Sequence, residues 1–296
     1  MFPKPITPSL DGDVRPVFVT GVPRCGSSWV GEVLGSCTGV RYVYEPFNLD
    51  WVPKLRGKLS HFKYLDANSE PSPIVKLAVD NACRGSQSRK QLIRAAYRGY
   101  WRAATRSASM VVIKDPTACL LTSWIAHQFN AKILIVMRHP CGFASSLAKL
   151  DWQVRVNILL RQKNLMRDHL GRYEDVMRCA INDKWLNFGA FWAAIHRVLI
   201  EQMAVHPHWV LCKYEDLCHD PSGQFSSLTR NLGLELSDNA HSKMLLNSTR
   251  ISTDPGSTRR ESSSMPHIWK HRMTKGEIDA VMGIVGEFGI GDYIDE

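Results

Sequence analysis

Residues 21–29 read GVPRCGSSW, a short stretch of glycines, hydroxyl residues and one arginine after the apolar run 17–19. Gly21 and Gly26 are separated by four residues, as in a phosphate-binding P-loop, but Ser27 stands where that pattern requires lysine. Arg24 supplies the positive charge, and its forked guanidinium suits a pair of phosphate or sulfate oxygens. The loop is poorly equipped for magnesium-dependent ATP chemistry. Taken alone, it is also compatible with a turn that only joins a strand to a helix.

A second basic residue stands at the end of another predicted strand. Arg138 follows the apolar run 133–137, and Ser145 and Ser146 lie on the helix predicted after it. This order of apolar strand, basic residue and helix hydroxyls repeats the plan of the first loop. The stretch is therefore a second candidate anion site.

Two carboxylates lie at predicted strand ends. Glu45 follows the predicted strand Val40–Tyr44, and Lys114 and Asp115 follow the predicted strand 110–113. An open α/β sheet presents its ligand side at the carboxyl ends of its strands. Glu45 is therefore either a site residue or a solvated loop carboxylate.

Four arginines, Arg94, Arg98, Arg102 and Arg106, recur at every fourth position of a predicted helix. Between residues 81 and 114 the sequence has no Asp or Glu. Like charges at this spacing repel one another on a helix face. Either these side chains are splayed into water, or an anion of an acidic acceptor or partner compensates them.

Alternating apolar strands and amphipathic helices position these residues. They predict an α/β fold: a three-layer sandwich with a central, mostly parallel sheet of the P-loop nucleotide-binding type. We expect residues 1–296 to form a single domain. Residues 1–16 carry four prolines and predict an extended lead-in, and residues 247–264 predict a mobile surface loop of the kind that closes over ligands.

The composition is that of an ordinary globular protein with a positive excess. The net charge of +9 suits an anionic ligand, a nucleic acid or an acidic membrane. The eight cysteines form no C-x-x-C pair, which favours free thiols over a zinc site. The sequence shows neither a signal-peptide core nor an apolar stretch of membrane-spanning length, so we expect a cytoplasmic setting.

Taken together, residues 17–274 resemble the sulfotransferases that use 3′-phosphoadenosine 5′-phosphosulfate (PAPS). The loop 21–29 is similar to that family's loop for the 5′-phosphosulfate, in which a basic residue, a glycine, two hydroxyl residues and often an aromatic residue follow in this order. The resemblance implies that the loop holds the 5′ end and that Trp29 lies against the adenine. The residues it assigns to the cofactor here are Arg24, Cys25, Gly26, Ser27, Ser28 and Trp29.

Three later motifs extend the resemblance. In ILIVMRHPCGFASSLAKL, Arg138 and Ser146 keep the spacing of the family's 3′-phosphate motif, and Tyr214 matches a tyrosine that borders the adenine. Residues 259–274 are similar to the family's loop from a basic pair to a Trp-Lys signature. The resemblance therefore implies that residues 247–273 cover the cofactor, with Arg259 or Arg260 at the 3′-phosphate.

The resemblance also suggests the chemistry. Members that act on phenols and steroids use a K-x-H histidine, but here Lys114 is followed by Asp115 and proline. The loop and the YVYEPF segment are closer to the carbohydrate branch, which implies Glu45 as general base toward a glycan or small-molecule hydroxyl. Arg24 and Lys114 would neutralise the charge of the departing group without a metal ion, and Asp115 is the second candidate base.

Two other classes of protein stay open from the residues. One is a kinase with an atypical P-loop, which Ser27 argues against. The other is a binding protein for nucleic acid or another anion on the same scaffold, without turnover. The resemblance itself implies no nucleic-acid partner, and the oligomeric state is open.

Overall fold

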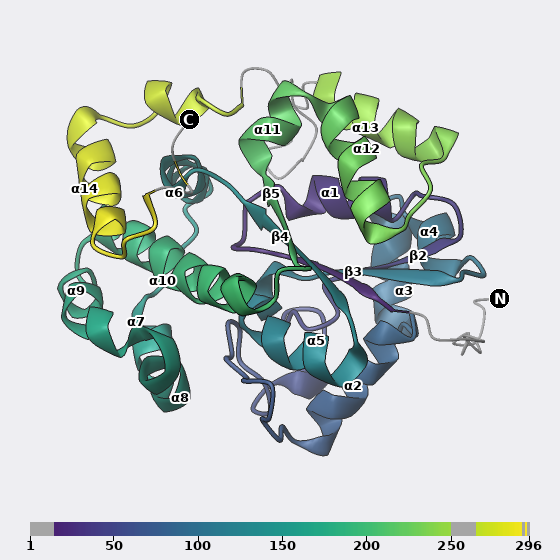
Figure 1. Ribbon diagram of the computed structural model, residues 1–296, viewed down its shortest axis with the longest axis horizontal. Coiled ribbons are helices and arrows are strands. Elements are labelled where there is room, and N and C mark those ends of the chain that lie inside the picture. The colour runs from purple at the N-terminus through teal and green to yellow at the C-terminus, as the bar shows by residue number, and fades with distance from the viewer. Residues whose placement is uncertain (1–14, 250–264, 292–293, 295–296) are drawn as a thin grey trace.

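Within residues 15–249, 265–291 and 294, which the computed structural model describes, five strands form one parallel sheet (Figure 1). Its order is β2-β3-β1-β4-β5, and every neighbouring pair is parallel. Most strand residues are buried, as expected for a parallel sheet covered on both faces. The predicted α/β fold is therefore confirmed. The strands are β1 (Val17–Thr20), β2 (Val40–Tyr44), β3 (Met110–Lys114), β4 (Lys132–Met137) and β5 (Val210–Lys213).

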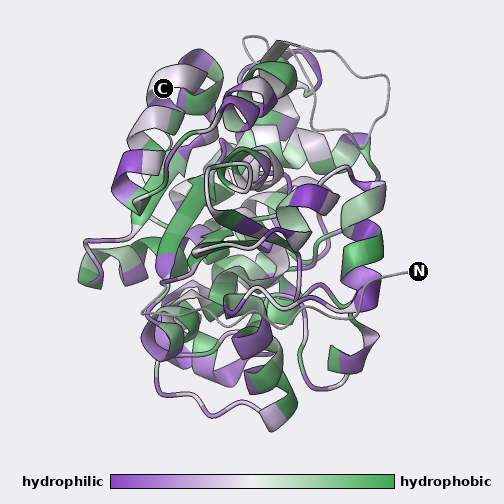
Figure 2. Ribbon diagram, turned by 90° about the vertical axis from the view of Figure 1, so that its right-hand side faces the viewer, coloured by the Kyte–Doolittle hydropathy of each residue, from purple (hydrophilic) through white to green (hydrophobic). Residues whose placement is uncertain are grey.

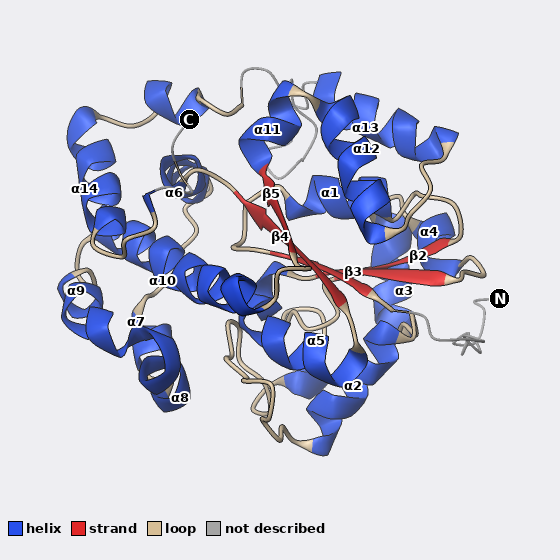
Figure 3. Ribbon diagram, viewed as in Figure 1, coloured by secondary structure: helices blue, strands red, loops and turns tan. Residues whose placement is uncertain are grey.

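Helices cover both faces of the sheet (Figure 3). α1, α12 and α13 lie on one face, and α2 and α5 lie on the other. The central strands are mostly hydrophobic (Figure 2). The helices are α1 (Ser27–Leu34), α2 (Pro73–Cys83), α3 (Arg89–Tyr97), α4 (Trp101–Thr105), α5 (Thr122–Phe129), α6 (Pro140–Lys149), α7 (Asn157–Leu160), α8 (Lys163–Leu165), α9 (Glu174–Cys179), α10 (Lys184–Val205), α11 (Tyr214–His219), α12 (Pro221–Leu232), α13 (Asp238–Thr249) and α14 (Lys275–Gly286), with 3-10 turns at Pro53–Leu55, Pro116–Leu121, Gly171–Tyr173 and Ile268–His271 and a π-helical turn at Met166–Leu170.

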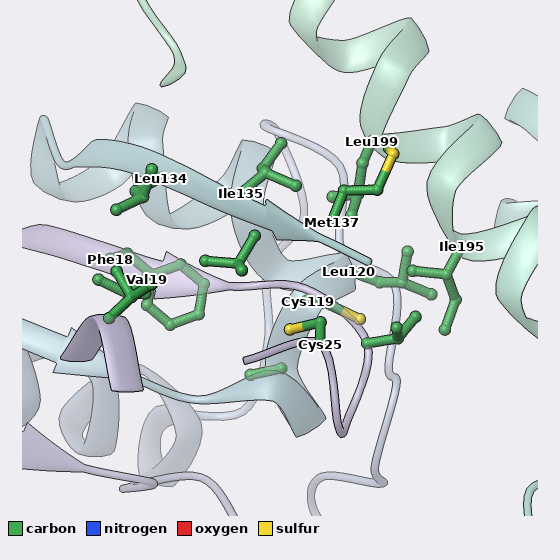
Figure 4. Packing of buried hydrophobic residues seen from close by; sticks show 14 of the residues in the cluster. Phe18, Val19, Cys25, Cys119, Leu120, Leu134, Ile135, Met137, Ile195 and Leu199 are labelled. Carbon is green, nitrogen blue, oxygen red and sulfur yellow. The ribbon is translucent and has the colours of Figure 1, made fainter. Parts of the chain in front are cut away.

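The hydrophobic core between the sheet and α10 anchors the loop of residues 21–26, the candidate phosphate loop (Figure 4). Phe18 and Leu134 from the strands and Ile195 from α10 are fully buried there. Burial of each such side chain stabilises the folded state by about 1.5–3 kcal/mol relative to leaving it exposed. Cys25 of the loop lies in the same core, and burial raises the pKa of its thiol. The Cys25 thiol therefore serves packing, and its backbone N–H donates to the carbonyl of Val22.

The four arginines do not share one helix face, so that prediction is wrong. α3 ends before Gly99, whose φ is +80°, and α4 begins at Trp101. The Tyr100 backbone N–H donates to the carbonyl of Ala95, which closes α3 with a tight turn. Arg94 lies on α3, Arg98 in the turn, Arg102 on α4 and Arg106 after it.

The long connection between β4 and β5 contains α6 to α10. The side chain of Asp183 caps α10 by accepting from the backbone N–H groups of Trp185 and Leu186. α10 packs against α6 and α14, which places α14 on the β4 side of the sheet (Figure 1). No helix among the described residues has both the length and the apolar character needed to span a membrane.

Candidate active site

The phosphate loop joins the end of β1 to the start of α1. Its backbone turns sharply, with φ of +68° at Arg24 and +98° at Gly26. A Cβ atom on Gly26 would meet Cδ2 of Tyr214 at 2.4 Å, so both the conformation and the close approach require glycine. Within the described residues no side chain caps the first turn of α1. The backbone N–H groups at Ser27 and Ser28 are therefore placed as an anion site requires.

The structure brings the second candidate anion site against the first. A guanidinium nitrogen of Arg138, Nη1, donates to the backbone carbonyl of Arg24 at 3.2 Å. In turn, Nε of Arg24 donates to Oγ of Ser146 at 3.0 Å. Segments 122 residues apart in the sequence thus meet at one edge of the sheet.

Arg138 is held in place but keeps an unused donor. Its guanidinium lies over the ring of Tyr214, 4.6 Å from the centroid. Its Nε is buried and has no hydrogen-bond partner in the described part of the chain. A Cβ atom on Gly142 would come within 2.9 Å of this nitrogen, so the glycine on α6 makes room for the guanidinium. An anion bound here would satisfy the unpaired donor.

Aromatic rings line the space beside Arg138. Trp29 is 4% exposed, and its ring meets Tyr214 edge-on at 6.4 Å and Phe225 at 5.5 Å. Tyr214 therefore lies between the arginine and the tryptophan. This places the two residues predicted to border an adenine next to each other.

Glu45 and Lys114 form a buried ion pair at the ends of neighbouring strands. The pair joins Oε1 of Glu45 to Nζ of Lys114 at 2.7 Å, and the two side chains are 10% and 3% exposed. The other carboxylate oxygen, Oε2, accepts from the side-chain amide of Asn48 at 2.9 Å. The two strands β2 and β3 are parallel, so their carboxyl ends meet at the same edge.

Opposing effects set the charge of this pair. Burial by itself raises the pKa of Glu45, but the charge of Lys114 and hydrogen bonds from Lys114, Asn48 and Tyr44 outweigh it and lower the pKa to about 2. Burial by itself lowers the pKa of Lys114, but Glu45 and Tyr44 outweigh it and raise the net value. Both side chains are therefore charged at neutral pH, and Glu45 is a weak base while Lys114 contacts it.

Asp115 has a different position from Glu45. It is fully buried, and its carboxylate accepts hydrogen bonds from the backbone of Phe47 and from both the backbone and hydroxyl of Thr117. Burial and the charge of Glu45 raise the pKa of Asp115 to about 7. Its oxygens therefore hold the turn that follows Glu45 and the start of the turn at Thr117.

Several residues at the site were not found from the sequence. Asn48 fixes Glu45, and Trp152 lies 5.6 Å from the Arg24 guanidinium. His139 stacks on Trp269 with ring centroids 4.5 Å apart, which brings the segment from residue 265 beside Arg138. The Pro140 that follows His139 signals a helix start, but no local pattern signals its ring partner.

Part of the predicted covering loop lies outside the described residues. This applies to Arg259 and Arg260, and to most of the segment 247–273. The lead-in 1–16 is likewise described only from Arg15. The described end of the loop, at Trp269, lies next to the 3′-phosphate candidate Arg138 through its stack on His139.

A hollow of about 370 Å³ opens beside the segment that follows Trp152. None of the predicted site residues lines it, so it is separate from the anion sites and from Glu45. The hollow is lined by Gln153, Val154, Arg155, Val156, Asn157, Ile181, Asn182, Asp183, Lys184 and Asn187.

Within the described residues no group of His, Cys, Asp and Glu side chains is arranged to hold a metal ion.

Solved structures of known proteins share the overall fold of this chain. The sulfotransferase domain of the Synechococcus PCC 7002 olefin synthase has 16% identity and a TM-score of 0.51 over 97% of this chain and 98% of that domain. The sulfotransferase domain from the curacin biosynthetic pathway has 15% identity and a TM-score of 0.48 over 93% and 98%. Mouse sulfotransferase SULT7A1, complexed with PAP, has 14% identity and a TM-score of 0.47 over 97% and 91%. No curated protein sequence matches.

The family of this chain is shown by a match to a family model. The model of the sulfotransferase family matches residues 16–238, which include the phosphate loop, the ion pair and the Arg138 motif. These residues make up most of the chain. The chain therefore belongs to the sulfotransferase family.

Proposed function

We propose that this sulfotransferase takes its sulfuryl group from PAPS and transfers it to a hydroxyl acceptor, with Glu45 as general base. One observation carries the proposal. The two cationic sites around Arg24 and Arg138 adjoin each other, on the same sheet edge as the buried pair of Glu45 and Lys114. PAPS carries anionic groups at both ends of an adenosine, and this edge offers a cation for each end. Family membership favours sulfuryl transfer over the kinase and over a binding protein without turnover.

The residues present fit each part of PAPS. The loop backbone with Arg24, Ser27 and Ser28 would hold the 5′-phosphosulfate. The unpaired Nε of Arg138, together with Ser146, would hold the 3′-phosphate. Trp29 and Tyr214 would border the adenine, and we keep Arg259 and Arg260 as further proposed ligands of the 3′-phosphate.

Glu45 then acts on the acceptor. A new bond forms between the acceptor oxygen and sulfur, the bond from sulfur to the bridging oxygen breaks, and the acceptor proton passes to Glu45. The products are a sulfate ester and the nucleotide bisphosphate. We further propose a carbohydrate or glycoconjugate acceptor, on the resemblance of the loop and of the Glu45 segment to the carbohydrate branch.

In this proposal Lys114 couples stabilisation of the leaving group to activation of Glu45 as the base. While it contacts Glu45, the carboxylate is a weak base. As negative charge grows on the bridging oxygen, Lys114 turns toward it, with Arg24 as a second cation. The carboxylate that remains is buried, and burial raises its affinity for a proton. The ammonium thus stabilises the leaving group and activates the base in one movement.

The test is a transfer assay with labelled PAPS against a mixed panel of hydroxyl acceptors. Wild-type protein is expected to label at least one acceptor. Glu45→Gln should lower turnover by about 10²–10⁴-fold, because the acceptor proton loses its base. The same variant should keep the thermal stabilisation given by the bisphosphate product, since the anion sites are intact.

A matched control is Glu70→Gln, which removes an exposed carboxylate whose partner Lys76 is also exposed. It should leave turnover unchanged. Normal turnover of Glu45→Gln would move the base role to another residue. The absence of both labelling and product-induced stabilisation in wild-type protein would overturn PAPS as the donor.

A further inference from the structure

Three cations surround one aromatic ring beside Glu45. The ring of Tyr44 has Nζ of Lys114 at 4.8 Å, Cζ of Arg94 at 5.2 Å and Cζ of Arg98 at 5.5 Å from its centroid. Tyr44 ends β2 and precedes Glu45 in the chain. A positive cluster therefore lies where an acceptor must approach the proposed base.

The carboxylate of Glu45 compensates only part of this charge. It pairs with Lys114, and neither Arg94 nor Arg98 forms an ion pair within the described part of the chain. Burial by itself lowers the pKa of Arg98, but Tyr44, Tyr100 and Glu45 outweigh it and raise the net value. Arg98 is an exposed residue whose guanidinium reaches the ring of Tyr44, so it adds a positive charge beside the proposed base.

Arg94 packs on an aromatic ring and has one unpaired nitrogen. Its guanidinium lies 3.2 Å from the ring centroid of Trp51, on the turn that follows Glu45. Its Nε is buried and has no hydrogen-bond partner among the described residues. A buried donor without an acceptor is costly, and an anion that accepts a hydrogen bond from this nitrogen would remove that cost.

These arginines lie away from the proposed PAPS site. β2 is the edge strand, and β3 and β1 separate it from β4, whose end carries Arg138. α3, which carries Arg94, lies near β2, whereas α6 and α11 lie across the sheet near β4 and β5 (Figure 1). The surplus charge is thus on the acceptor side of the site.

We infer that the acceptor bears an anionic group, which Arg94 and Arg98 bind beside Tyr44 while its hydroxyl faces Glu45. The group is a carboxylate, a sulfate ester or a phosphate, since all three suit a guanidinium. This inference rests on the proposed function and narrows its acceptor to an acidic alcohol or acidic glycan.

The experiment compares matched acceptors. A glucuronate-containing oligosaccharide is assayed beside its methyl ester, and sulfated and phosphorylated sugars are assayed beside their unmodified forms, so that each pair tests one source of charge. Wild-type protein should prefer at least one anionic member by tenfold or more in kcat/KM. In Arg94→Gln and Arg98→Gln the kcat/KM for that anionic member should fall by about 10- to 100-fold, the range expected for a charge-assisted hydrogen bond.

Two further readouts distinguish binding of the acceptor from binding of PAPS. The KM for PAPS and the kcat/KM for the neutral acceptors should change less than about threefold in these variants, because the donor site is intact. Arg102→Gln is the matched control, since it removes the same charge from an exposed position on α4. It should keep the wild-type preference.

Two results would contradict an anionic acceptor group. A wild-type preference for the neutral members, or an equal loss for both members in Arg94→Gln, would overturn the inference. Thermal stabilisation by the acidic oligosaccharide in the presence of the bisphosphate product tests binding without turnover. If that stabilisation depends on Arg94 but no acceptor is labelled, the anion site stands and the proposed function fails.

Discussion

Positively charged side chains lie at the carboxyl ends of β4 and of β3, but within the described residues only the one at β3 is paired with a carboxylate. At the β4 end, Arg138 has no ion pair within the described residues and keeps a buried nitrogen unpaired. At the β2 and β3 end, Lys114 lies 2.7 Å from Glu45 and both are buried. The first arrangement is open to an anion from outside, whereas the second supplies its own.

The charged and titratable groups near Arg138 differ from those near Glu45. Burial is the largest cause that lowers the pKa of His139 to about 4, and the charges of Lys270, Arg138 and His267 lower it further. The Glu215 carboxylate accepts from the backbone N–H of His139 at 3.1 Å but forms no ion pair with Arg138 within the described residues, whereas Glu45 at the other end is paired with Lys114. An anion site is thus built from unbalanced charge, and a base site from a balanced pair that the reaction must separate.

The largest expected effect is on the balanced pair. Lys114→Met should lower the free energy of unfolding by about 3–5 kcal/mol, because it leaves the Glu45 carboxylate buried without its cation. The double variant Lys114→Met/Glu45→Gln should regain most of this loss, as measured by urea unfolding. Arg138→Met is the comparison and should cost much less, since no ion pair is broken. Equal stability of the single and double variants would contradict the pairing.

A pH effect tests the surplus charge near Arg138. The pKa of His139 is about 4 in the folded protein and 6.5 ordinarily, so the unfolded chain binds a proton first as pH falls. Stability from this group is fully present above pH 6.5 and is lost as pH falls toward 4, by about 2 kcal/mol after allowance for solvent screening.

His139→Asn should flatten this part of the pH profile. Asparagine can still cap α6, where Nδ1 of His139 accepts from the backbone of Cys141. Bound bisphosphate should flatten the wild-type profile as well, because a nearby anion favours the protonated ring. A profile that His139→Asn leaves unchanged would show that the pKa of His139 is not lowered in the folded protein.

A smaller effect concerns affinity. Arg138→Gln should weaken binding of the bisphosphate product by about 10- to 100-fold in calorimetry, because one charge-assisted contact is lost. Lys163→Gln, which removes an exposed charge of the same sign, should change it by less than about twofold. An Arg138→Gln variant with wild-type affinity would remove this residue from the donor site.

Much of the fold follows from local patterns. The strand Val40–Tyr44 and the helix Ser27–Leu34 lie at the residues where periodicity places them. The glycine spacing of the phosphate loop is also a local signal, because a left-handed residue at Gly26 starts the helix. The predicted arginine face was wrong because Gly99 and Tyr100 end α3, a break that charge spacing alone does not reveal.

By itself, the sequence determined where the short apolar strands end and which charged residues follow them, since apolar periodicity and turn residues act over a few positions. The tertiary structure alone decided that Lys114 neutralises Glu45, 69 residues away, while Arg138 and Arg94 keep unpaired nitrogens. The reason is physical: parallel pairing gathers the carboxyl ends of all strands at one edge, and the strand order there, with the packing of α3 and α6, sets which charges meet.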